Sequence, residues 1–318
     1  MRKLISLISS SALVAVLLAA PLPAAASTTS CTSTGFRGLT AAQIGGAVSG
    51  ALDASGCDIG AYFDAANPGS VSGANIYEAG SYGVLVNGDN GPVAVNVTSS
   101  SVHDVGVLGI YYRAYLGGAA AGQISGNLIS RYGLEGIVTN GPGTSVQIQG
   151  NTVTGTNGRT WNVGIQVGFG ASASVTGNIV SDNLGSVSGG ITVVGGPGYG
   201  TCTGGIPCPY TLGTQIANNT LTNNDIGVWL SNCADSSCGT TSQTATNIKV
   251  VNNMITDSYV WNGYYQAGVS DVGNNDKIIA NVISGAGYVT STTCTYCYSI
   301  DAAPPYSMAS KVHANAIQ

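Results

Sequence analysis

Residues 124–129 read ISGNLI, residues 148–153 read IQGNTV and residues 175–180 read VTGNIV. Each copy places an asparagine between two apolar residues. The same place is taken along the chain by Ala74, Ser100, Asn127, Asn151, Asn178, Asn219, Asn253, Asn281 and Asn315. Successive anchors are 24 to 41 residues apart, and most gaps are 24 to 28 residues. A repeat of this length is typical of a solenoid in which each copy forms one coil.

Each anchor is followed by a second short pattern that begins with glycine, such as Gly109-Ile-Tyr-Tyr112 and Gly164-Ile-Gln-Val167. Apolar residues alternate within it, which is typical of a strand with one inward face. Two or three short strands per turn, stacked in parallel about 4.8 Å apart, predict an all-β fold. We expect a single-stranded right-handed parallel β-helix of about nine coils, because parallel crossover connections are strongly biased to that hand. The asparagines would then stack as an amide ladder.

The same alternation places one residue of each Gly-led strand on the outer surface. These outward positions form a column: Leu85, Tyr111, Val138, Gln166, Thr192, Trp229 and Ser270. The column predicts either a ligand groove or a covered surface.

The N-terminal region carries a helical pattern. Thr40-Ala-Ala-Gln43 reads as a capping box, and Ile44, Val48 and Leu52 follow at helical spacing. We therefore expect a short capping helix within an N-terminal cap at residues 36–56, ahead of coils at 57–318. The pattern contains no linker, which favours one domain over 27–318.

The first 26 residues have the pattern of an export signal. Arg2 and Lys3 precede an apolar run from Leu4 to Leu22, and Ala24-Ala25-Ala26 resembles a cleavage site. A membrane anchor is the alternative, but the apolar core is short for one. The signal predicts a secreted protein, whether extracellular, periplasmic or held at the cell surface.

The charge of the chain limits its partners. It has 9 Lys and Arg against 14 Asp and Glu, and two of the cations lie in the predicted signal, so the remainder carries a net charge of about −7. With so few cations, nucleic acid is not an expected partner, and neither is insertion into a membrane. The composition does not predict the oligomeric state.

Eight cysteines in an exported chain predict disulfides. Proximity in sequence favours the pairs Cys31–Cys57, Cys202–Cys208, Cys233–Cys238 and Cys294–Cys297. A metal site at the last pair is the weaker alternative, because His103 and His313 are the only histidines that could complete it.

Candidate site residues gather at the corner between the anchor strand and the Gly-led strand. Its longer loops carry aromatic side chains suited to the apolar faces of sugar rings, and we expect these to bind substrate: Trp161, Tyr259, Trp261, Tyr264 and Tyr265. Charged residues of the same corner are catalytic candidates: Asp182, Asp225, Asp257 and Arg159. Paired carboxylates could act as acid and base in glycoside cleavage or could hold Ca²⁺. Alternatively, the aspartates only accept hydrogen bonds within turns.

The Gly-led first strand Gly56-Cys57-Asp58-Ile59 and the Asn-anchored coils resemble the pectate-lyase-like superfamily of right-handed β-helix proteins, over about residues 40 to 318. The resemblance implies the fold but not one activity, because the superfamily includes lyases, hydrolases, epimerases, adhesins and spikes. The Asn-Thr-Asp, Gly-His-Gly and Arg-Ile-Lys strings of polygalacturonase-like hydrolases are not found here. The aspartates with Arg159 or Arg131 form a loose analogue of the calcium cluster and base of pectate-lyase-like enzymes.

These patterns lead to two hypotheses of different classes. The first is a secreted protein that binds extracellular polysaccharide or processes it as a lyase or hydrolase, with Ca²⁺ as a possible cofactor. The second is a non-catalytic, adhesin-like surface module in which the solenoid is a rigid scaffold.

Overall fold

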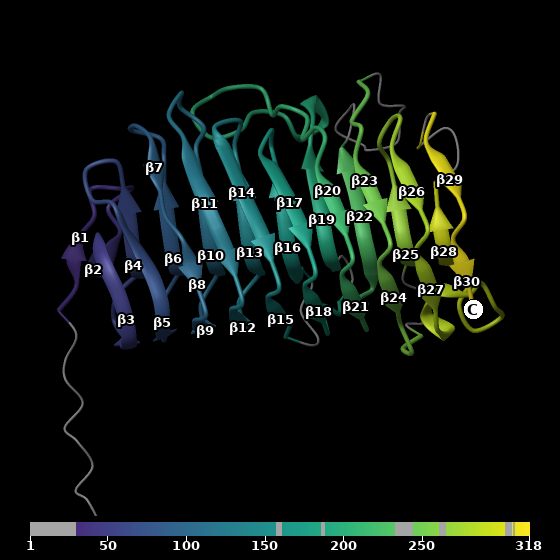
Figure 1. The fold of residues 1–318 in the computed structure, drawn as a ribbon, viewed down its shortest axis with the longest axis horizontal. Coiled ribbons are helices and arrows are strands. Elements are labelled where there is room, and N and C mark those ends of the chain that lie inside the picture. Colours follow the sequence, from purple (N-terminus) through teal and green to yellow (C-terminus); the bar gives the residue numbers. More distant parts are fainter. Residues whose placement is uncertain are drawn as a thin grey trace, which may run out of the picture.

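The computed structural model describes residues 30–156, 161–185, 188–232, 244–260, 265–302, 307 and 309–318. Its strands stack side by side in chain order from one end of the molecule to the other (Figure 1). They form an all-β parallel solenoid of about nine turns, which confirms the prediction from the asparagine repeat. The right-handed sense of the coil stays a prediction.

One sheet, called sheet A, consists of the Gly-led strands. Its eleven strands are β1 (Thr32–Ser33), β2 (Thr40–Ile44), β4 (Ile59–Asp64), β6 (Tyr82–Asn87), β10 (Leu108–Arg113), β13 (Glu135–Asn140), β16 (Val163–Gly168), β19 (Gly189–Gly195), β22 (Ile226–Asn232), β25 (Gln266–Asp271) and β28 (Cys297–Asp301). All neighbours pair in parallel except β1, which runs antiparallel to β2.

The other sheet, called sheet B, consists of two rows of short strands that meet at the asparagine corner. The strands β3 (Gly46–Asp53) and β5 (Gly69–Tyr77) run through both rows, since they pair with each other and β5 pairs with β8 and with β9. The first row otherwise contains β7 (Val93–Ala94), β8 (Val97–Thr98), β11 (Ala120–Ser125), β14 (Thr144–Gln149), β17 (Ser172–Thr176), β20 (Gln215–Ala217), β23 (Lys249–Val251), β26 (Lys277–Ile279) and β29 (Lys311–His313). The second row contains β9 (Ser101–Val105), β12 (Leu128–Tyr132), β15 (Thr152–Thr154), β18 (Ile179–Ser181), β21 (Thr220–Thr222), β24 (Met254–Thr256), β27 (Val282–Ser284) and β30 (Ala316–Ile317).

The apolar core lies between the two sheets. Val and Ile side chains fill it from every coil, as with Ile110 of sheet A and Ile124 and Ile129 of sheet B, all fully buried. The glycines that begin the sheet A strands allow close packing here. A Cβ atom at Gly136 would lie 2.5 Å from a methyl group of Val153 and 2.7 Å from the carbonyl oxygen of Gly164.

The predicted N-terminal helix is wrong. Residues Thr40–Ile44 and Gly46–Asp53 are the strands β2 and β3, which pair in parallel with β4 and β5. Gly45 and Gly46 lie where β2 ends and β3 begins, and their φ values are 62° and 75°. This left-handed conformation interrupts a right-handed helix. The segment therefore forms a coil of its own instead of covering one. The described residues contain only two helical turns, the 3₁₀ segments η1 (Pro197–Tyr199) and η2 (Ala286–Tyr288). No helix in this part of the chain has the length and apolarity needed to cross a membrane.

The asparagine corner is an unbroken ladder of hydrogen bonds. In each rung the side-chain Nδ2 atom donates to the Oδ1 atom of the next asparagine, as from Asn151 to Asn178 and from Asn178 to Asn219, at 2.9 and 3.0 Å. The same Nδ2 atom also donates to a backbone carbonyl of the preceding coil, as from Asn178 to Ile148 at 3.1 Å. The interior asparagines are at most 2% exposed. The predicted amide ladder is confirmed.

We predict that Asn178→Ala lowers the free energy of unfolding by about 2 to 4 kcal/mol, because several buried donors and acceptors lose their partners. Gln149→Ala is the matched control, since Gln149 is an exposed residue of the neighbouring strand. Urea unfolding followed by circular dichroism measures both changes. Equal stability of the two variants would contradict a structural role for the ladder.

Candidate functional site

The outer face of sheet A carries the predicted outward column in register. Leu85 pairs with Tyr111, and the pairing continues through Val138, Gln166, Thr192, Trp229 and Ser270. The N-terminal half of this face is covered, because Phe36 and Leu39 pack on a cluster that includes Tyr62, Leu85 and Tyr111.

A buried ion pair holds the edge of this covered half. Arg113, at the end of β10, bonds Asp89 at 2.6 Å, and both side chains are almost fully buried. The guanidinium of Arg113 also lies 4.8 Å from the ring centre of Phe36. These contacts fix the N-terminal segment onto sheet A.

Two tryptophans meet on the same face further along the solenoid. Trp161 enters from the corner loop just before β16, and its ring centre lies 6.1 Å from that of Trp229 on β22. The Trp161 Nε1 atom donates a hydrogen bond to Oε1 of Glu135 at 3.1 Å. Both indoles are half-buried. Trp161 therefore contacts both the coil of β13 and the coil of β22, although the strand β19 lies between β16 and β22.

Glu135 is the acidic member of this cluster. It is the first residue of β13 and is only 9% exposed. Burial raises the pKa of its carboxyl from 4.5 to about 7, and the hydrogen bond from Trp161 offsets part of the rise. At neutral pH, protonated and ionised forms of Glu135 coexist, so this carboxyl could donate or accept a proton.

Polar side chains of the central coils lie in the same column as Trp229, because Gln166 pairs with Thr192 and Thr192 pairs with Trp229. Gln166 donates from Nε2 to Oδ1 of Asn140 at 3.2 Å. The Oγ1 atom of Thr192 is buried and has no hydrogen-bond partner among the described residues. Gly189 leaves room beside this hydroxyl, because a Cβ atom there would lie 2.9 Å from it. We call Glu135, Trp161, Gln166, Thr192 and Trp229 the indole cluster.

Sequence reasoning missed Glu135. The register aligns it with Leu108 and Val163, and beyond these with Tyr82 and Gly189. The other residues at this position of the repeat are apolar, aromatic or glycine. The single carboxylate among them is a signal from which Glu135 could have been found. Trp161 was predicted as a binding residue and Trp229 as a member of the outward column.

Two of the predicted catalytic aspartates, Asp225 and Asp257, are buried beneath the corner. Asp225 accepts a hydrogen bond from the backbone N–H of Gly185 at 2.5 Å. Asp257 accepts from the N–H of Tyr259 at 2.9 Å and from Nε2 of Gln266 at 2.7 Å. Burial raises the pKa of each carboxyl from 3.8 to about 7, and the charge of Asp257 further raises that of Asp225.

The other predicted catalytic residues are placed differently. Asp182 is half-buried at a corner position with a φ value of 60°, a conformation that Asp tolerates well in turns. Arg159 lies outside the described residues. The structure thus brings Asp225 and Asp257 under one corner, and catalysis by any of these residues stays a prediction.

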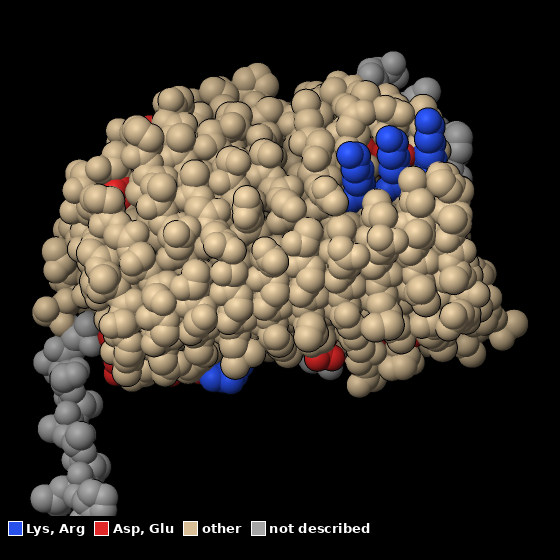
Figure 2. Space-filling model, viewed as in Figure 1, with Lys and Arg blue, Asp and Glu red and all other residues tan. Residues whose placement is uncertain are grey.

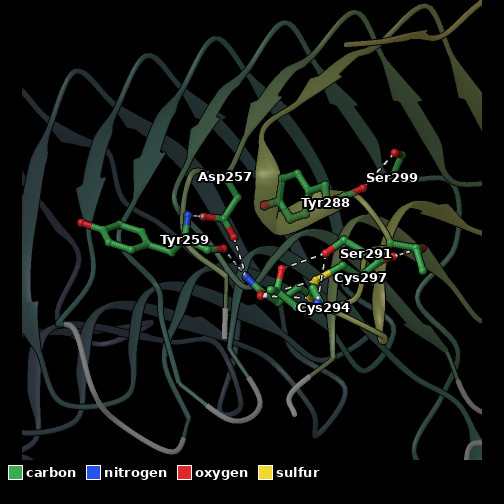
Figure 3. The surroundings of a disulfide bond; sticks show 10 residues. Asp257, Tyr259, Tyr288, Ser291, Cys294, Cys297 and Ser299 are labelled. Carbon is green, nitrogen blue, oxygen red and sulfur yellow. Dashed lines mark hydrogen bonds between the residues drawn. A yellow bond between two sulfur atoms is a disulfide. The ribbon is translucent and has the colours of Figure 1, made fainter. Parts of the chain in front are cut away.

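The described members of the predicted aromatic set are placed in different surroundings. The Tyr259 side chain is 48% exposed, and its ring points away from the Asp257 carboxylate (Figure 3). Tyr265 packs along sheet A, where its hydroxyl donates to Oδ2 of Asp301 at 2.7 Å and its ring centre lies 5.7 Å from that of Tyr298. Trp261 and Tyr264 lie outside the described residues.

Three predicted disulfides are confirmed: Cys31–Cys57, Cys202–Cys208 and Cys294–Cys297. The last one lies close to Asp257 and Tyr288 in Figure 3. Tyr288 is fully buried there, and its hydroxyl donates to the carbonyl oxygen of Asn224 at 2.5 Å. The predicted pair Cys233–Cys238 lies outside the described residues.

A metal site is not indicated by the described side chains. Within these ranges, no group of three or more His, Cys, Asp and Glu residues is placed to hold an ion. The predicted use of Ca²⁺ stays a prediction.

Stacked parallel strands, in-register columns and an interior amide ladder decide the fold class. The chain is a parallel β-helix. Several solved structures are similar to this chain, at low identity and with TM-scores below 0.5. The DFA-IIIase of Arthrobacter chlorophenolicus A6, crystallised with DFA-III, is 12% identical with a TM-score of 0.43, and the match covers 82% of this chain and 62% of that one. The Dettilon tailspike protein is 13% identical with a TM-score of 0.41, covering 87% and 53%.

A third similar structure is PfbA, a surface adhesin of Streptococcus pneumoniae. It is 12% identical with a TM-score of 0.35, and the match covers 75% of this chain and 66% of that one. No protein-family model and no curated protein matches the β-helix chain. At these identities the likeness concerns the fold alone.

Stability should fall as pH rises from about 4.5 to about 7. In the folded protein Glu135 keeps its proton up to about pH 7, whereas an ordinary glutamate loses it near 4.5. Its contribution to stability is therefore complete below pH 4.5 and is lost as pH rises through 7. Asp225 and Asp257 act in the same direction.

We predict that Glu135→Gln removes part of this pH dependence, because the amide does not ionise. Relative to the wild type, the variant should gain roughly 1 to 3 kcal/mol of unfolding free energy between pH 4.5 and 8. Urea unfolding at a series of pH values measures the gain. A constant difference across this range would show that the Glu135 carboxyl titrates normally.

Proposed function

We propose that this protein is secreted and binds extracellular polysaccharide on the outer face of sheet A, at the indole cluster. The observation that carries the proposal is the contact between Trp161 and Trp229, two half-buried indoles that lie next to a buried carboxyl. Aromatic faces pack against the apolar faces of sugar rings, while neighbouring polar groups fix their orientation.

The polar groups of the cluster suit hydroxyl-rich ligands. Glu135 can accept a hydrogen bond when ionised and donate one when protonated. The Thr192 hydroxyl has no described partner, so a ligand or water that reached it would satisfy a buried group. The position of the cluster on a rigid sheet supports binding with little loss of conformational entropy.

Secretion is supported by the signal-like pattern of residues 1–26 and by the disulfides, which form and persist in oxidising compartments. The low number of cations over the whole chain disfavours nucleic acid as a partner.

We predict that Trp161→Ala and Trp229→Ala each weaken binding to the recognised sugar polymer at least tenfold, which is about 1.4 kcal/mol. Binding is measured on a glycan array and then by titration calorimetry. Tyr296→Ala is the matched control, because Tyr296 is a 54% exposed aromatic residue near β28, outside the cluster. If both tryptophan variants fold normally and bind like the wild type, the proposed site is wrong.

A processing role is a second candidate, favoured by the raised pKa of Glu135. If the protein cleaves a polysaccharide, Glu135→Gln should reduce kcat at least about 100-fold, because the amide is not a proton donor at neutral pH. Binding of the uncleaved polymer should persist. Asp182→Ala and Asp257→Ala test the aspartates predicted from sequence in the same assay.

A non-catalytic, adhesin-like scaffold is the alternative to both roles. It predicts that no soluble glycan binds at the indole cluster and that neither tryptophan variant changes attachment to a surface.

A further inference from the structure

Three lysines stack on the outer surface of sheet B. Lys249, Lys277 and Lys311 begin the strands β23, β26 and β29 and pair directly in register. Figure 2 shows a blue row near the C-terminal end of a largely uncharged face, with some red acidic atoms visible between the blue side chains. They are all the lysines beyond residue 26.

The row of lysines continues a longer polar column. The same outward position in the preceding coils is occupied by Gln123, Gln147, Ser174 and Gln215, which pair in the same register up to Lys249. A shallow groove of about 480 Å³ follows this column. Its lining includes Gln147, Ser174 and Gln215 of the column together with Ser145 and Ser172. At about 4.8 Å per coil, the seven positions span about 29 Å along the axis.

Stacking the lysines carries an energetic cost. Like charges placed directly opposite each other in a sheet are destabilising. Among the described residues, no carboxylate lies within ion-pair distance of any of the three ammonium groups. Asp276 precedes Lys277 in the chain but is fully buried, and its Oδ1 atom accepts hydrogen bonds from Thr246 and Ile248. None of the three lysines therefore has a direct ion-pair partner among the described residues.

We call Lys249, Lys277 and Lys311 the lysine row. We propose that the lysine row and the polar groove that continues it bind a linear anionic polysaccharide, which runs parallel to the solenoid axis. Carboxylate or sulfate groups of successive sugars would contact successive lysines, and the glutamine and serine side chains would bond hydroxyl groups in the groove. Both the rigid spacing and the charge are complementary to such a polymer.

The geometry favours a polysaccharide over nucleic acid. The phosphates of one strand recur about every 3.4 Å along the axis of a DNA duplex, which is out of register with coils about 4.8 Å apart. The lysine row lies on sheet B, so this inference goes beyond the proposed sheet A site and does not depend on it.

The test compares the wild type with the triple variant Lys249→Gln, Lys277→Gln, Lys311→Gln. Binding to polygalacturonate, dextran sulfate and uncharged dextran is measured by calorimetry at several salt concentrations. The triple Lys→Arg variant keeps the charges and is the matched control. Tyr296→Ala is a second control, because Tyr296 is a 54% exposed residue outside both proposed sites.

We expect the triple Gln variant to lose at least tenfold in affinity for a polyanion at low salt. The slope of log affinity against log salt should become shallower by about two, because fewer counterions are released. The Arg and Tyr296 variants should bind like the wild type. Unchanged polyanion binding in the triple Gln variant, equal affinity for uncharged dextran, or tighter binding of single-stranded DNA than of either polyanion would overturn the proposal.

Discussion

The hydrogen bonds between stacked asparagine side chains are the constraint on which the molecule depends. Each interior amide donates to the next rung and to a carbonyl of the preceding one, as Asn219 does to Asn253 at 2.9 Å and to Val175 at 3.0 Å. An amide buried without these partners would cost more than the bonds themselves contribute. The ladder therefore fixes the register of the coils, so that residues far apart in sequence become neighbours in columns.

Both proposed binding surfaces are consequences of this register. On sheet A it allows an indole from the coil of β16 to reach Glu135 on one side and Trp229 on the other. On sheet B it aligns Lys249 with Lys277 and Lys311. The chain has few charges, and the solenoid gathers several of them: one acid in a buried aromatic setting and three cations in a row on the surface. The first setting favours sugar rings, and the second favours acidic groups on a polymer.

The repeat made the fold and the columns predictable. The spacing of Asn127, Asn151 and Asn178 is a property of the sequence, and strand alternation assigns inward and outward faces without knowledge of loops. The predicted helix at residues 40–52 was wrong because its apolar spacing fits a helix as well as a strand, whereas strand pairing with β4 and β5 decides the outcome. Gly45 and Gly46 were the local signal against the helix.

The site was less predictable because burial depends on contacts between coils. Asp225 and Asp257 are at the predicted corner, but their burial results from how the backbone at Gly185 and the side chain of Gln266 fold onto them. Glu135 was missed because its outward position suggests exposure, and only the approach of Trp161 explains its setting. Loop conformation of this kind has no periodic signal in the sequence.

The most direct test of the central claim is hydrogen exchange of asparagine side-chain amides, measured by NMR on protein labelled with ¹⁵N-asparagine. We predict that the ladder amides of Asn127, Asn151, Asn178, Asn219 and Asn253 exchange at least about 100-fold more slowly than the amide of Asn252, an exposed corner residue. Exchange of the ladder amides as fast as that of Asn252 would contradict the stacked asparagine core.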